Sequence, residues 1–407
     1  MRCCWSRRPL FSAAVEIIDG DRGKEYPKHS DFSDSGYCLF LNTGNVRPDG
    51  FDFSNCQFIS EETDQRLRKG KLARYDLVMT TRGTIGNVAY YDDNVPYETV
   101  RINSGMVIFR ADASRLHPSF LYHFLRSPDF IGQTISMRSG VAQPQFPIRD
   151  IRRVELPTPD LAIQRKIASV LSAYDDLIEN NRRRMALLEE AARHLYREWF
   201  VRLSFPGHEH TRVTNGVPKG WERKTLGDLC KEIRESVSPD VLEPDTPYIG
   251  LEHMPRRSIS LNDWGKAEQV TSSKHRFRAG ELLFGKIRPY FHKVGIAFVD
   301  GVASSDAIVI RTMEDKLRGL VLMTVSSDEF VAVTAQTMKE GSKMPRADWK
   351  QMQQYLVPLP PDGLLKSFES VIQPLVEQLR TLSFANQKLH AARDLLLPRL
   401  MSGEIAV

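Results

Sequence analysis

The sequence repeats itself at about half its length, and this repeat constrains the fold more than any other feature. Residues 100–110 read VRINSGMVIFR, and residues 301–311, which lie 201 positions later, read GVASSDAIVIR. At the same offset, residues 156–159 (LPTP) match residues 357–360 (VPLP). Several collinear matches across half a chain are rare by chance, so we interpret the chain as two copies of one unit.

Length and composition place the chain among globular proteins. Its 407 residues are enough for two or three domains, 41% of them are hydrophobic and 26% are charged, which excludes disordered and collagen-like classes. The longest apolar run is only a few residues, whereas a membrane span needs about 20. We therefore expect no transmembrane helix and no membrane partner, and the basic N-terminus lacks the apolar core of a secretory signal.

The cysteines and the net charge indicate the redox compartment and the kind of partner that the protein can bind. The five cysteines form no C-x-x-C pair, and an odd number without such pairs predicts plain thiols in a reducing cytoplasm. The net charge of +5 permits a polyanionic partner without requiring one.

Each unit divides into a strand-rich part and a helical part. About 155 residues at the start contain short β-branched or aromatic runs separated by Gly, Asn and Asp turns. Thr158-Pro159-Asp160 then provides a helix start, and no Gly or Pro follows until after Phe200. We expect mixed α/β domains at residues 1–157 and 204–357, followed by long helices at residues 158–203 and 358–403.

A heptad pattern runs along both helical segments. In the first segment the positions step by four and three residues: Ile167, Leu171, Tyr174, Ile178, Asn181, Met185, Leu188, Ala192, Leu195 and Trp199. Shifted by 201, the pattern becomes Phe368, Ile372, Leu375, Leu379, Leu382, Asn386, Leu389, Arg393, Leu396 and Leu400. Such a seam is typical of a coiled coil. The alternative is two amphipathic helices, each packed on its own domain.

Two units related by a pseudo-two-fold axis would pair their helices antiparallel, so that the residue numbers in each layer have a constant sum. A sum of 567 sets Asn181 opposite Asn386 and Tyr174 opposite Arg393, the latter as a cation–π pair. The apolar layers are then Ile167 with Leu400, Leu171 with Leu396, Ile178 with Leu389, Met185 with Leu382, Leu188 with Leu379 and Leu195 with Ile372. Two facing asparagines satisfy each other and specify the register, whereas an asparagine against leucine would leave its amide unpaired at a cost of about 1–3 kcal/mol.

The length of the helices suggests the kind of target. At about 1.5 Å per residue, a forty-residue helix is roughly 60 Å long. Two copies of a domain on such helices suit a target with two parts. A DNA site with two half-sites separated by one helical turn (~34 Å) or more is the obvious candidate.

A set of motifs, taken in order and twice, covers nearly the whole chain: residues 19–27, 75–86, 156–168, 285–290 and 400–405. In this order they resemble the specificity subunits of type I restriction-modification systems. The resemblance implies an α+β fold in which two mixed α/β target-recognition domains are separated by two long helices that form an antiparallel coiled coil. Each domain would read one half of a bipartite double-stranded DNA sequence.

The resemblance also implies partners. The helices would set the spacing between the half-sites and dock two methyltransferase (modification) subunits, and restriction subunits would then join. Two departures stand out: residues 362–366 lack the glutamine that residue 164 provides in the first helix, and the N-terminus reaches Asp19 abruptly, whereas the second domain has a longer lead-in at residues 220–228.

A search for catalytic motifs finds no methyltransferase loop and no P-loop. Residues 222–224 and 348–350 resemble fragments of a metal-dependent nuclease, yet neither follows an upstream Pro-Asp. His208 and His210 lack the i, i+4 spacing of a helical zinc site, and residues 19–23 read as a tight turn rather than a calcium loop. We therefore expect no active site, cofactor or metal on this chain. By resemblance, S-adenosylmethionine, ATP and Mg would belong to the partner subunits.

Candidate DNA contacts lie in loops at matching places of the two repeats, because cations suit phosphates while Arg, Asn and Gln suit base edges. They are Arg82, Thr84, Arg101, Gln143, Gln145, Lys286, Arg288, Tyr290, Lys293, Lys343 and Arg346. For each of them the alternative is a solubilising surface residue. For the whole chain the alternatives are a stand-alone DNA-modifying enzyme and a protein-binding coiled-coil scaffold.

Overall fold

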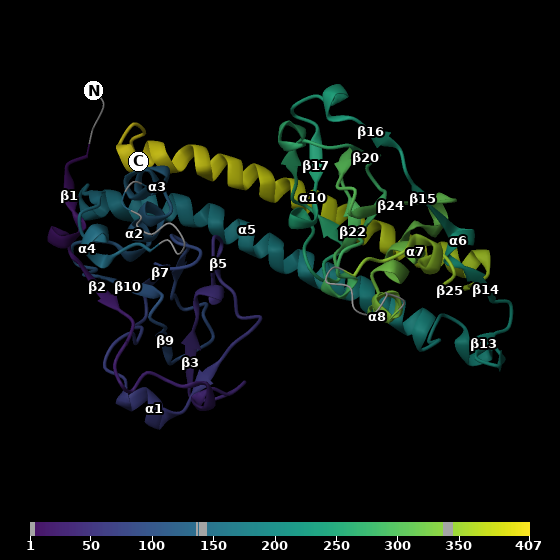
Figure 1. The fold of residues 1–407 in the computed structure, drawn as a ribbon, viewed down its shortest axis with the longest axis horizontal. Coiled ribbons are helices and arrows are strands. Elements are labelled where there is room, and N and C mark those ends of the chain that lie inside the picture. Colours follow the sequence, from purple (N-terminus) through teal and green to yellow (C-terminus); the bar gives the residue numbers. More distant parts are fainter. Residues whose placement is uncertain (1–4, 136, 138–144, 337–344) are drawn as a thin grey trace. The chain divides into compact units, whose positions relative to one another are not determined.

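The computed structural model describes residues 5–135, 137, 145–336 and 345–407. Its contacts divide the chain into two compact units (Figure 1). Unit 1 consists of residues Met1–Leu177 and Leu389–Val407, and unit 2 of residues Ile178–Lys388. Both long helices therefore contribute one part to each unit.

The core of unit 1 is an antiparallel sheet of four strands in the order β2 (Val15–Asp19), β10 (Met106–Ala111), β7 (Leu77–Thr80) and β8 (Val88–Tyr90). Side chains alternate between the two faces of these strands. Leu77 and Phe109 pack with the helices α2 (Pro118–Leu125) and α3 (Pro128–Ile135). Val78 and Ile108 pack with a second sheet of β6 (Phe58–Ile59), β3 (Cys38–Leu41) and β9 (Val100–Ile102).

Unit 2 repeats this arrangement. Its corresponding sheet has the order β15 (Cys230–Ile233), β24 (Ala307–Thr312), β21 (Leu282–Gly285), β22 (Val294–Ala297) and β18 (Ser260–Leu261). Phe284 and Ile308 share a core with α7 (Arg318–Val325) and α8 (Asp328–Gln336), while Leu283 and Val309 face the second sheet. That second sheet has the order β16 (Ser236–Val237), β20 (Lys274–Phe277), β23 (Gly301–Ala303), β17 (Pro247–Ile249) and β19 (Gly265–Lys266).

A short antiparallel strand pair precedes the long helix of each unit. In unit 1 it is β1 (Arg7–Pro9) with β11 (Glu155–Pro157), and in unit 2 it is β14 (Glu222–Thr225) with β25 (Leu356–Leu359). Trp5 and Trp221 precede the first strand of each pair, and the Trp5 indole donates a hydrogen bond to the Leu400 carbonyl. The expectation of an abrupt N-terminus is therefore wrong, since residues 5–9 provide the counterpart of the lead-in of the second domain.

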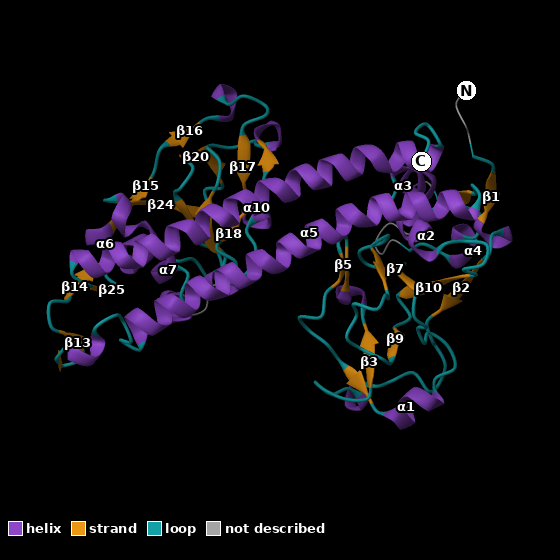
Figure 2. Cartoon of the chain, turned by 180° about the vertical axis from the view of Figure 1, so that it is seen from behind, coloured by secondary structure: helices purple, strands orange, loops and turns teal. Residues whose placement is uncertain are grey.

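The two long helices are α5 (Leu161–Tyr196), which ends in a π-turn at Arg197–Val201, and α10 (Asp362–Ser402), both visible in Figure 2. They lie within the predicted ranges 158–203 and 358–403. Among the described residues, neither these nor any other helix combines the length and the apolar character that crossing a bilayer requires.

Within each unit the two helices share a core. In unit 2 the α5 residues Met185, Leu188 and Leu195 belong to one hydrophobic cluster with Ile372, Leu379 and Leu382 of α10. In unit 1, Ile167 and Leu171 share a cluster with Leu396 and Leu400. These groups agree with the sum of 567. The predicted Tyr174–Arg393 pair is wrong, because the Arg393 guanidinium bonds to the carboxylates of Asp175 and Asp394 instead.

The sequence analysis predicted strands in the first part of each unit but did not predict the helices there. Besides α2, α3, α7 and α8, the described residues contain short helices at α1 (Glu61–Arg66), α4 (Ile148–Ile151), α6 (Leu226–Leu229) and α9 (Trp349–Met352). These helices span four to nine residues, so each carries at most about two and a half turns of the 3.6-residue period. Two-residue strands complete the fold: β4 (Val46–Arg47), β5 (Gly50–Phe51), β12 (Val213–Thr214) and β13 (Val217–Pro218).

Candidate nucleic-acid interface

The predicted recognition loops are built on the same backbone scaffold in both units. In unit 1, Thr81 donates its N–H to the Gly105 carbonyl at 2.8 Å and accepts from the Phe146 N–H at 3.0 Å. In unit 2, Lys286 donates to the Asp306 carbonyl at 2.7 Å and accepts from the Ala347 N–H at 2.9 Å. Single β-bridges join Arg82 to Gln145 and Ile287 to Arg346. Lys286 therefore occupies the place of Thr81, and Arg346 that of Gln145.

The loop of unit 1 joins β7 to β8 and presents Arg82, Gly83 and Thr84 to solvent. The Thr80 hydroxyl stabilises the base of the loop, because this hydroxyl donates to the Thr84 carbonyl and accepts from the Asn87 N–H at 3.1 Å. Gly83 has φ +70°, a value that costs little only for glycine. Hydrogen bonds therefore fix the base of the loop, while its tip is exposed to solvent.

The loop of unit 2 joins β21 to β22. Two of its predicted DNA-binding lysines instead bond to backbone carbonyls of the protein itself. Lys286 Nζ donates to the Ser305 carbonyl at 3.0 Å, and Lys293 Nζ donates to the Leu251 carbonyl at 2.5 Å. Burial lowers the pKa of both amines. Arg288 remains exposed, at φ +50°.

A cation–aromatic cluster forms the exposed side of this second loop. The Phe291 ring lies 4.1 Å from the Arg256 guanidinium and 5.7 Å from that of Arg288. Tyr290 packs edge-on against Phe291, with ring centroids 5.0 Å apart, and is 52% exposed. The Arg346 side chain is 59% exposed and lies 3.3 Å from the Asp306 carboxylate. Sequence reasoning missed Arg256, because its only signal is an Arg-Arg pair 32 positions before Arg288.

Arg101 does not belong to this interface. It is only 5% exposed, and its guanidinium bonds to the Asp64 carboxylate, to the Lys69 carbonyl at 2.7 Å and to the Leu67 carbonyl at 3.1 Å. The prediction of a DNA contact is therefore corrected: Arg101 is a structural residue that joins β9 to the end of α1. Its sequence position next to a loop gave no sign of burial, because the carbonyls that surround it come from residues more than thirty positions away.

The remaining predicted contacts divide into two groups. Thr84, Gln145 and Tyr290 lie in the two loops or beside them, and their DNA contacts stay predictions, as do those of Arg82, Arg288 and Arg346. Gln143 and Lys343 lie outside the described residues.

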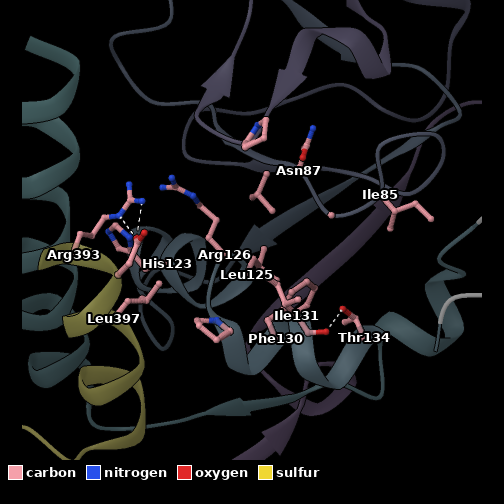
Figure 3. A pocket seen from close by; sticks show the side chains of 15 residues that line it. Ile85, Asn87, His123, Leu125, Arg126, Phe130, Ile131, Thr134, Arg393 and Leu397 are labelled. Carbon is pink, nitrogen blue, oxygen red and sulfur yellow. Dashed lines mark hydrogen bonds and ion pairs between the residues drawn. The ribbon is translucent and has the colours of Figure 1, made fainter. Parts of the chain in front are cut away.

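A pocket of about 470 Å³ lies next to the unit 1 loop (Figure 3). Asn87 and Ile85 of the loop line one side of it, and Arg126, His123 and Arg393 line the other. The Asp175 carboxylate lies 2.9 Å from Arg126 Nη1 and 2.6 Å from Arg393 Nη1. Burial lowers the pKa of His123 to about 3, so this imidazole is neutral at physiological pH.

The chemistry available in the two loops is that of DNA binding. Guanidinium groups and amides suit phosphates and the edges of guanine and adenine, and an exposed aromatic ring suits a base face or a thymine methyl group. Within the described ranges, no three His, Cys, Asp or Glu side chains are grouped so that they could hold a metal ion.

Comparisons with known proteins agree with this geometry. Residues 15–190 match the type I restriction modification DNA specificity domain. The specificity subunit of the type I restriction enzyme MjaIX from Methanocaldococcus jannaschii is 24% identical over 352 residues, which cover 81% of this chain and 78% of that protein. The specificity subunit of the enzyme HindI from Haemophilus influenzae is 19% identical over 461 residues, which cover 95% of this chain and 98% of that protein.

A solved structure has the same fold. The S subunit of a type I restriction-modification system from M. genitalium has a TM-score of 0.58 to this chain, at 14% sequence identity, and the match covers 97% of this chain and 96% of that one. The duplicated unit and the paired helices agree with these similarities. Residues 15–190 of this chain are similar to the type I restriction modification DNA specificity domain, and the chain is similar over most of its length to the specificity subunits of type I restriction enzymes.

Proposed function

We propose that this protein is the non-catalytic DNA-recognition subunit of a type I restriction-modification complex, and that each unit reads one half of a bipartite double-stranded DNA target. The observation that carries the proposal is the recognition loop built twice on one scaffold with different side chains. Thr81 and Gln145 in unit 1 are replaced by Lys286 and Arg346 in unit 2. A conserved scaffold with exchanged side chains is what reading two different half-sites requires.

The two loops favour different base edges. Unit 1 presents Arg82, Thr84 and Gln145, and a glutamine forms a bidentate pair with adenine while an arginine forms one with guanine. Unit 2 presents Arg288 and Arg346 together with the exposed ring of Tyr290. We infer a first half-site that contains adenine and guanine contacts, and a second half-site dominated by guanine contacts and an aromatic contact.

The rest of the assembly follows from the same proposal. The long helices set the distance between the half-sites and dock two methyltransferase subunits, and restriction subunits join the complex. S-adenosylmethionine, ATP and Mg belong to those partner subunits. The proposed location is the cytoplasm, where chromosomal and invading DNA are both accessible.

Mapping of methylated adenines across the genome, in cells with and without this chain, tests the proposal. We expect one bipartite motif that disappears on deletion and returns with the wild-type gene. Exchange of residues 206–357 for those of a relative should change one half of the motif and leave the other. The proposal fails if the methylation pattern is the same with and without the chain, or if the exchange changes both halves.

A further inference from the structure

The α5 helix carries a buried carboxylate that faces the second recognition domain. Glu189 is 5% exposed, and its Oε1 accepts hydrogen bonds from the Ser258 and Ser260 hydroxyls, both at 2.7 Å. Its Oε2 accepts from the Ile259 N–H at 3.2 Å and from Arg193 Nη2 at 3.3 Å. A buried carboxylate is stable only when it is hydrogen-bonded in this way. Three of the four donors come from residues 258–260, so they attach α5 to the turn that leads into β18.

This attachment continues to the recognition loop of unit 2. Arg193 Nη2 also donates to the Arg257 carbonyl at 2.6 Å, and the Arg257 N–H donates to the His292 carbonyl at 2.9 Å. His292 lies at the end of the loop that carries Arg288, and its Nε2 donates to the Ser326 carbonyl at 2.8 Å. Arg257 also forms an ion pair of 2.7 Å with Asp328.

The backbone along this route is held in an unusual conformation. Arg257 has φ +56° and His292 has φ +53°, values that non-glycine residues rarely adopt and that persist only where the surroundings hold them. The hydrogen bond from Arg193 of α5 to the Arg257 carbonyl and the one from the Arg257 N–H to the His292 carbonyl provide such surroundings. The loop end therefore has one defined position relative to the helix.

Unit 1 uses a different attachment. The residue 201 positions after Glu189 is His390, so the second copy of the helix has no carboxylate at this place. In unit 1, α5 contributes the Asp175 carboxylate, which bonds to Arg126 next to α2 and to Arg393 of α10. The chain of hydrogen bonds from an α5 carboxylate through Arg193 and Arg257 to the candidate loop is thus a feature of unit 2.

We propose that Glu189 is a positioning residue that fixes the second recognition loop at one place along α5 and so sets the spacer length that the protein accepts between its two half-sites. This rests on the proposed function. Loss of the carboxylate leaves the donors at residues 258–260 without an acceptor, which lets the turn shift along the helix. The Arg288 N–H keeps its own hydrogen bond to the Pro345 carbonyl at 2.9 Å, so the tip of the loop keeps its shape and its base preference.

The test uses the complex of this chain with its methyltransferase subunits and duplexes that carry the mapped half-sites at the native spacer and at spacers one base pair shorter or longer. The quantity measured is the ratio of methylation rates on the native and altered spacers. Glu189→Gln keeps the shape of the side chain but removes its charge and replaces one of its two acceptor oxygens with an N–H₂ donor. We expect its spacer ratio to fall at least fivefold, while its base preference at each half-site is unchanged.

Two further variants complete the design. Glu190→Gln is the matched control, because it removes the same charge from the exposed neighbour on the same helix, and its spacer ratio should equal that of wild type. The double variant Ser258→Ala/Ser260→Ala removes the same contact from the domain side, so it should lower the ratio as well, which keeps the test valid if Glu189→Gln folds poorly.

The outcomes separate the two levels of inference. A spacer ratio equal to wild type in Glu189→Gln and in the double serine variant overturns the positioning role, even if the overall rates fall. Wild-type complexes that methylate no bipartite motif overturn the proposed function itself.

Discussion

Asn181 of α5 donates its side-chain N–H to the side-chain oxygen of Asn386 of α10 at a distance of 2.9 Å. The side-chain N–H₂ group of Asn386 in turn donates a hydrogen bond to the Ile178 carbonyl at 3.5 Å. Both residues belong to unit 2, and the pair lies in the layer that the sum of 567 assigns to it. The predicted antiparallel register is therefore confirmed at this asparagine layer.

This pair predicts a characteristic mutational pattern. Asn181→Leu leaves the Asn386 amide in the helix interface with an unsatisfied group, so we expect a loss of about 1–3 kcal/mol in the free energy of unfolding. Asn181→Leu/Asn386→Leu should recover most of this loss, because both polar groups are then removed. Urea unfolding followed by circular dichroism measures the cycle. Additive losses in the double variant would contradict the pairing.

The second prediction concerns Arg101 and Asp64. Arg101→Met leaves the Asp64 carboxylate buried with only Lys71 Nζ, at 2.6 Å, as a cationic partner. Breaking a buried pair from one side costs about 3–5 kcal/mol, and we expect a loss near the lower value because Lys71 remains. Arg82→Met is the control, because an exposed substitution changes stability by about 0.5 kcal/mol or less. Equal melting temperatures in the two variants would restore Arg101 to the candidate DNA contacts.

The same ion pair makes stability depend on pH in the acid range. Burial alone would raise the pKa of Asp64, but the hydrogen bonds from Lys71 and Arg101 outweigh it and hold that pKa below the ordinary value of 3.8. A depressed pKa contributes stability that is complete above the unfolded value and is lost as the pH falls through the folded one. We expect Asp64→Asn to flatten the decline of stability below about pH 4. An acid-unfolding curve identical to that of wild type would contradict this.

The third prediction concerns base reading. Arg288→Ala should relax one position of one half-site, and Arg82→Ala one position of the other, each at a cost of about 1–3 kcal/mol in discrimination. Lys286→Ala should weaken binding much less, because its amine already bonds to the Ser305 carbonyl. Methylation of duplex libraries randomised at the half-sites measures each effect. If neither arginine variant alters the preferred bases, the loops are assigned wrongly.

The fourth prediction concerns Glu369 of α10. Burial raises its pKa from 4.5 to about 7, against the opposing hydrogen bond from the Gly319 N–H at 2.9 Å. A carboxyl group with a raised folded pKa stabilises the fold below the unfolded pKa, and that contribution is lost as the pH rises from about 4.5 to about 7. Glu369→Gln should therefore melt at a higher temperature than wild type at pH 8 and at a similar one at pH 4.5. Glu190→Gln, in the exposed position on α5, should show no such difference.

The candidate site was only partly predictable. The repeat offset predicted that the two candidate loops are equivalent, and the structure builds both on the same backbone scaffold. The offset could not separate Arg82, which is exposed, from Arg101, which is buried beneath the loop that follows α1. It also missed Arg256, because a cation that packs on Phe291 from a distant turn leaves no pattern in the neighbouring sequence.

The sequence by itself determined the duplicated architecture, the extent of the two long helices and the register of their pairing. These depend on periodicity along a single segment, which a seven-residue repeat and one asparagine in each copy are enough to specify. Only the tertiary structure decided that Asp64 is the partner of Arg101, that Glu189 lies against residues 258–260 and that Lys293 bonds back to Leu251. The physical reason is that burial and hydrogen-bond partners are set by segments far apart in the chain, whereas heptad spacing is set by residues three and four positions apart.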